Sequence, residues 1–124
     1  MLAPEALRGT RVIADPSAID ALVAALPVGA TGLRFAPDEA LILGVAGVAL
    51  DDPDAIVEDE AGFVAVTVDR ALVEAHTDWP LPDTGAVAQG SIAGVPAKLA
   101  WLPDGRAWIV THAAYVDELL DRLR

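Results

Sequence analysis

The chain has 124 residues and carries 19 acidic against 8 basic side chains, a formal net charge of −11, yet 54% of its residues are apolar. The apolar content excludes a disordered acidic tail, and the negative charge argues against a nucleic-acid partner because it repels phosphates. A chain of this length usually folds as one domain and buries roughly two thirds of the surface that its unfolded form exposes. We therefore predict a single soluble domain over residues 1–124.

The chain contains no cysteine, so disulfides, thiolate metal sites and cysteine nucleophiles are excluded. A chain without cysteine suits a reducing compartment, and residues 1–15 lack the apolar core of an export signal. The apolar run at residues 40–50 contains two glycines and is well short of the roughly 18–20 apolar residues that a membrane-spanning helix needs. We expect a cytoplasmic protein with no membrane segment.

The first half of the chain predicts the order strand, helix, strand, strand. Asp15 and Pro16 form a typical helix start, with an acidic cap before a proline, and the apolar residues that follow recur with helical spacing. Pro37 suits the second position of a tight turn between the last two strands. The expected elements are a strand at 10–14, a helix at 16–26 and strands at 32–36 and 40–45.

The same order recurs in the second half, and we interpret the recurrence as an internal repeat. A proline-aspartate turn again lies between two apolar strands, and a closing helix ends in arginines that favour the negative pole of its dipole. The expected elements are a strand at 62–68, a helix at 70–77, strands at 95–102 and 106–111 and a helix at 113–123. The pseudo-repeats cover about residues 10–50 and 62–124.

Residues 51–60 separate the two repeats and contain six acidic side chains with no basic one. Clustered carboxylates are typical of calcium sites, but this stretch has apolar Ile56 and no glycine at the positions that a calcium loop requires. We interpret it as a solvated acidic connector with a short strand inside it. The predicted fold class is α+β: two β-α-β-β repeats forming a mainly antiparallel sheet with helices on one side, plus a C-terminal helix.

Motifs for catalysis are missing from the sequence. The glycine spacing fits no phosphate-binding loop, and Ser91 lacks the preceding glycine of a nucleophile elbow. His76 and His112 have no zinc spacing, and we expect them to end the second helix beside Asp78 and to cap the last helix, respectively. We predict no catalytic residue, no metal site and no cofactor, although a carboxylate pair for acid–base work cannot be distinguished among 19 acids.

The remaining large anchors are Trp79, Trp101 and Trp108. Trp101 and Trp108 flank one predicted turn, and residues this close across a hairpin can lie side by side on one face. Core packing is the simplest role for at least one of them. If they share an exposed face with Arg106 at its rim, the patch is typical of a partner interface. Trp79, Trp101, Arg106 and Trp108 are therefore the candidate interface residues.

From Ile56 onward the chain resembles the gamma subunit of heterotetrameric sarcosine oxidase, a small relative of the aminomethyltransferase-like folate-binding domain. The resemblance rests on residues 56–63, 89–96 and 113–116, and residues 34–41 resemble the family's earlier hairpin more loosely. It implies a duplicated α+β fold and a supporting role beside larger subunits that hold flavin and folate, with no active site in the chain itself. This chain differs from the family in its shorter N-terminus and its acidic connector.

Our leading hypothesis is a soluble, non-catalytic interaction subunit whose partners are larger oxidoreductase subunits. The alternative is a small stand-alone domain that binds folate or another one-carbon carrier, in which Lys98 and Arg106 would meet a carboxylate. A small enzyme or sensor with an apolar pocket is a third class, but no residue favours it. Uncovered sheet edges also permit a homodimer.

Overall fold

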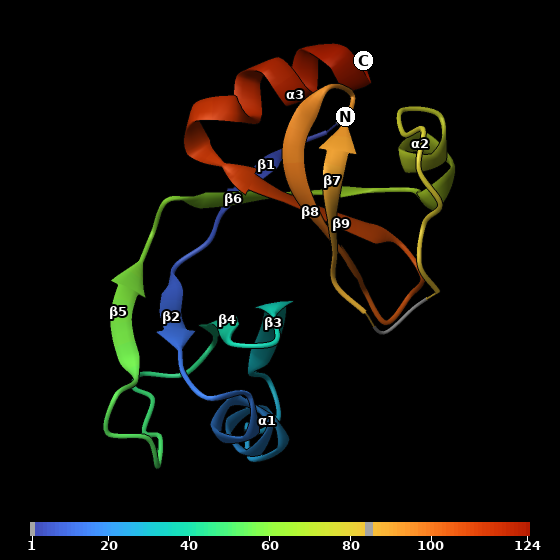
Figure 1. The fold of residues 1–124 in the computed structure, drawn as a ribbon. Coiled ribbons are helices and arrows are strands. Elements are labelled where there is room, and N and C mark those ends of the chain that lie inside the picture. Colours follow the sequence, from blue (N-terminus) through green and yellow to red (C-terminus); the bar gives the residue numbers. More distant parts are fainter. Residues whose placement is uncertain (1, 84–85) are drawn as a thin grey trace. The chain divides into compact units, whose positions relative to one another are not determined.

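The computed structural model describes residues 2–83 and 86–124 (Figure 1). The chain forms two compact units, one made of residues 8–61 and the other of residues 1–7 together with 62–124. Each unit combines a purely antiparallel sheet with at least one helix, which confirms the α+β class. No helix in the described part of the chain is long and apolar enough to cross a membrane. That the chain folds as one domain stays a prediction.

The unit of residues 8–61 is a four-stranded sheet with one helix packed on it, in the strand order β3-β4-β2-β5. Val12, Ala40 and Ile42 project from one face of this sheet and are fully buried. Ile19 on α1 is buried against the same residues. The elements are β2 (Gly9–Ile13), α1 (Pro16–Ala24), β3 (Thr31–Ala36), β4 (Glu39–Leu43) and β5 (Ile56–Glu60).

The start of α1 is fixed by its cap. Asp15 Oδ1 accepts hydrogen bonds from the Ser17 hydroxyl at 2.7 Å and from the Ser17 backbone N–H at 3.0 Å, which satisfies a donor that the first helical turn leaves unpaired. Both bonds lower the pKa of Asp15 below its ordinary value of 3.8, and the bond from the Ser17 hydroxyl contributes most. The cap and Pro16 place the helix start where the sequence predicts it.

Arg11 ties three strands of this sheet together. It lies on β2 directly opposite Glu58 of β5, and its guanidinium donates to Glu58 at 2.9 Å and to Glu39 of β4 at 2.7 Å. The hydrogen bonds to Glu39 and Glu58 raise the pKa of Arg11, and the bond to Glu39 contributes most. Because all three side chains are partly exposed, each pair adds on the order of 0.2–1 kcal/mol to stability.

The other unit is a five-stranded sheet in the order β1-β6-β9-β8-β7. Leu99 and Ile109 project from one face, where Val73 of α2 and Leu119 of α3 complete the core. Both helices therefore cover the same face of this sheet. The elements are β1 (Pro4–Ala6), β6 (Phe63–Val68), α2 (Arg70–Glu74), β7 (Ala88–Ile92), β8 (Val95–Trp101), β9 (Ala107–His112), the 3₁₀ turn η1 (Ala113–Tyr115) and α3 (Val116–Leu123).

The observed fold corrects the prediction in three places. The strands form two sheets where one sheet was expected. The short strand expected inside the connector at 51–60 is confirmed: residues 56–60 are β5 and pair along their whole length with β2. Strands β1 and β7 were not predicted, and α1 and α2 end earlier than expected, at Ala24 and Glu74.

The two units have similar strand orders, although one sheet has five strands and the other four; that they form an internal repeat stays a prediction. In each unit an inner strand, β2 or β6, is followed in the chain by a helix. A hairpin, β3-β4 or β8-β9, pairs on one side of that strand, and an edge strand, β5 or β1, pairs on the other. The edge strands are exchanged: β1 leads directly into β2 but pairs with β6, and β5 leads directly into β6 but pairs with β2. The links are only Leu7-Arg8 and Ala61-Gly62.

The chain crosses between the two units at two short links, Leu7-Arg8 and Ala61-Gly62, and we predict that the units unfold together. Ile19→Ala removes a fully buried side chain from the unit of residues 8–61 and should lower the free energy of unfolding by about 2–5 kcal/mol. Trp79, Trp101 and Trp108 all lie in the other unit, so tryptophan fluorescence in a urea titration reports the unit that was not changed. We expect its midpoint to fall together with that of far-ultraviolet circular dichroism; an unmoved fluorescence midpoint would mean independent domains.

Candidate functional site

A hollow of about 300 Å³ lies on the five-stranded sheet, within the unit that contains it. Strand pairing aligns Gln89 of β7, Lys98 of β8 and Val110 of β9 in a row. These residues alternate along their strands with the buried Leu99 and Ile109, so the row lies on the sheet face opposite the helices. The lining residues are Phe63, Gln89, Gly90, Ser91, Pro96, Ala97, Lys98, Val110, Thr111 and His112.

The polar groups of this hollow are held by contacts within the sheet. Lys98 Nζ donates to Gln89 Oε1 at 3.3 Å and lies 5.6 Å from the centroid of the Phe63 ring. Phe63 stacks on His112 with 4.6 Å between ring centroids, because β6 and β9 pair these two residues directly. The hollow thus offers an ammonium, an amide and an imidazole beside an aromatic ring, and none of its described lining residues is Asp or Glu.

The Thr111 side chain fixes the two strands beneath the hollow. Thr111 is buried, and its hydroxyl donates to the Pro96 carbonyl at 2.9 Å. A buried hydroxyl without a partner would cost about 1–3 kcal/mol, so this bond both satisfies the group and holds β8 against β9. Sequence reasoning missed this contact and the Phe63–His112 stack, since both depend on strand register.

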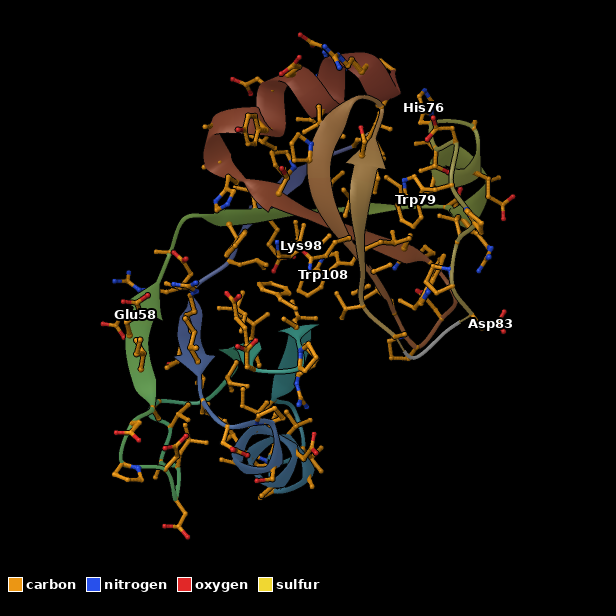
Figure 2. All side chains as sticks on the ribbon, in the orientation of Figure 1. Glu58, His76, Trp79, Asp83, Lys98 and Trp108 are labelled. Atoms are coloured by element: carbon orange, nitrogen blue, oxygen red, sulfur yellow. The ribbon has the colours of Figure 1, made fainter. Side chains whose placement is uncertain are left out.

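Trp79 lies beside β7, packed against the core of its unit (Figure 2). Its indole N–H donates to the Ser91 carbonyl at 2.8 Å. A Cβ added at Gly90 would be 2.7 Å from the indole ring, so the ring occupies the space that the missing side chain leaves. Trp79 therefore has a structural role at the outer side of β7.

Trp101 and Trp108 lie on opposite faces of the sheet. The register pairs Trp101 with Ala107 and Ala100 with Trp108, and neighbouring residues of a strand point to opposite faces. The condition that they share one face is therefore not met, and Figure 2 shows Trp108 near Lys98 on the other face. Trp101 packs against the core with the Arg70 guanidinium 4.6 Å from its ring centroid.

Arg106 lies in the exposed turn between β8 and β9. Its side chain donates to Asp104 at 2.8 Å, and its backbone N–H donates to the same carboxylate at 2.9 Å. Both bonds lower the pKa of Asp104, and the bond from the backbone N–H contributes most. Arg106 is not among the residues that line the hollow with Lys98. That Trp79, Trp101, Arg106 and Trp108 form an interface stays a prediction.

The two histidines have separate environments. His76 follows α2, where its Nδ1 lies 2.9 Å from the Leu72 carbonyl, in agreement with a role at the end of that helix. His112 precedes η1 as predicted, but its side chain makes no capping hydrogen bond and stacks on Phe63 instead. In the described ranges, no three His, Cys, Asp or Glu side chains gather as a metal site would require.

Comparisons with known proteins identify a structural likeness but no sequence family. No protein-family model and no curated protein matches the chain. A chain of the heterotetrameric sarcosine oxidase from Corynebacterium sp. U-96, solved in complex with pyrrole 2-carboxylate, matches with a TM-score of 0.76 and 15% identity. The match covers 99% of this chain and 80% of that chain. The fold is thus that of a chain of sarcosine oxidase. This is the same enzyme whose gamma subunit the sequence resembles.

The packing of Trp79 gives a direct test of its role. Gly90→Ala should displace the indole and break its bond to Ser91, which we expect to cost about 1–3 kcal/mol of stability and to change the near-ultraviolet circular dichroism. Gly47→Ala is the matched control, because no heavy atom lies within 4 Å of its added Cβ, and it should alter stability by less than about 0.5 kcal/mol. Equal effects of the two substitutions would contradict the assignment.

Proposed function

We propose that this chain is a cytoplasmic, non-catalytic subunit that assembles with larger oxidoreductase subunits. The observation that carries the proposal is the structural match to a chain of a heterotetrameric oxidase, which covers 99% of this chain and 80% of that chain. A fold alone does not fix a function. The proposal therefore also draws on the environments of this chain's own ionisable groups.

The shifted pKa values of the described residues have local structural causes. Active sites typically hold buried titratable groups whose pKa values are shifted by their neighbours. Here the shifted groups are the helix cap Asp15, the turn residue Asp104 and the cross-strand Arg11. Each shift is explained by hydrogen bonds that serve the fold, and the proposal gives these three groups a structural role.

A complex isolated from the native cell tests this proposal. The full chain, tagged and expressed at its natural level, should elute from a sizing column well ahead of its own 12.8 kDa mass, in fixed stoichiometry with a larger polypeptide. The complex should carry the visible absorbance of a flavin, since the resemblance implies a flavin-bearing partner. Elution as an isolated chain, without a stoichiometric partner, would overturn the proposal.

The hollow on the five-stranded sheet favours a second function, the binding of a folate or a similar carboxylated ligand. Its volume of about 300 Å³ is at the lower end of the range for small-molecule sites, and Lys98 supplies a cation. Ligand selectivity would come from the Lys98 ammonium and the Gln89 amide. This function is compatible with a subunit role, because a bound ligand and a docked partner need not use the same surface.

Thermal unfolding with added folates separates this second function from the first. A folate at 100 times its dissociation constant should raise stability by about 2.7 kcal/mol, seen as a higher melting temperature. Lys98→Met should remove that shift, whereas Arg106→Met, at an exposed cation outside the hollow, should keep it. No shift with the unaltered chain, or equal shifts in all three proteins, would count against folate binding in the hollow.

A further inference from the structure

The two sheets have four edge strands, and three of them are protected against pairing with another chain. Strand β1 has three residues and begins with Pro4, which has no backbone N–H to donate. Strand β3 is irregular, with a register shift between Arg34 and Ala36. The outer side of β7 is covered by Trp79, which bonds the Ser91 carbonyl. Short length, proline, irregularity and cover are the usual means of blocking a sheet edge.

The fourth edge, β5, has none of these four protections and is guarded only by its charged side chains. It pairs in unbroken register with β2 over residues 56–60 and contains no proline. It is the outermost strand of the four-stranded sheet (Figure 1), and residues 56–59 are exposed. Ile56 and Val57 are 51% and 46% exposed, and as neighbours in a strand they point to opposite faces of the sheet. An edge of this kind presents N–H and C=O groups to an incoming strand.

The charge of β5 decides what kind of strand it can accept. Glu58, Asp59 and Glu60 follow one another, and they project alternately to the two faces of the sheet. In the centred antiparallel pairing, a second copy of β5 would set Glu58 against Glu58 in a chain whose net charge is already −11, and like charges across a strand pair destabilise it. A basic strand would meet complementary charge at one end and the apolar Ile56 and Val57 at the other.

We propose that β5 is a docking edge that takes up an extended basic segment of a partner protein as the fifth strand of this sheet. The inference rests on the proposed role as an interaction subunit and names the surface and the partner's chemistry. Backbone hydrogen bonds supply affinity in this mode of recognition, and side chains on alternate faces supply selectivity. The partner segment carries Lys or Arg opposite Glu58 and Asp59, and apolar residues opposite Ile56 and Val57.

Peptide binding to the full chain tests the charge requirement. The probe is a fluorescein-labelled peptide in which arginines follow two valines, measured by polarisation in both sequence directions, with a glutamate-for-arginine peptide as the control. The arginine peptide should bind and the glutamate peptide should not. Asp59→Lys should weaken binding by about tenfold or more. Asp54→Lys makes the same charge change in the exposed loop before β5 and should leave affinity within about twofold.

The remaining outcomes separate failure of the docking edge from failure of the proposed function. If the chain isolated from its native cell keeps a stoichiometric partner and Asp59→Lys does not weaken that complex, the subunit role stands and the docking edge is wrong. Equal weakening of peptide binding by Asp59→Lys and Asp54→Lys would reduce the effect to bulk charge and also overturn it. A homodimer that is dispersed by Val57→Glu would assign the edge to a second copy.

Discussion

The exchange of edge strands is the constraint on which the rest of the structure depends. Strand β1 leads directly into β2 but completes the sheet of β6, and β5 leads directly into β6 but completes the sheet of β2. The Leu7 N–H extends the first exchange by donating to the Phe63 carbonyl at 2.9 Å. Phe63 is also the residue that stacks on His112. The N-terminal strand is thereby connected through one residue to the hollow on the five-stranded sheet.

The central strands and the helices could be predicted from the sequence because burial leaves a pattern. Residues 63–68 are a continuous apolar run, and Asp15 with Pro16 marks the start of α1. The edge strands leave no such pattern, because exposed residues need not be apolar. Residues 88–92 include Gln89, Gly90 and Ser91 and have the composition of a loop, and their strand structure is fixed by pairing with β8.

The candidate site could be predicted only in part, for the same reason. Lys98 was recognised as a cation near the second hairpin, and the structure places it in the hollow. Arg106 does not line the hollow with Lys98, because it lies in a turn where its side chain bonds Asp104. Trp101 and Trp108 looked like one patch, but the register of the hairpin places them on opposite faces. Register is a property of the paired strands, and spacing within one strand does not determine it.

The strand exchange also bears on how such a chain could have arisen. A half-length chain with the topology of either repeat would begin with a strand that does not pair in its own sheet. Two residues would join this strand to a sheet that has no edge strand on one side. Two identical half-chains could satisfy each other by trading that strand, as in a domain-swapped dimer. Duplication and fusion would then turn an obligatory dimer into one polypeptide without any change in strand pairing. Removal of residues 1–7 would accordingly leave its defect at β6, far along the sequence from the deletion.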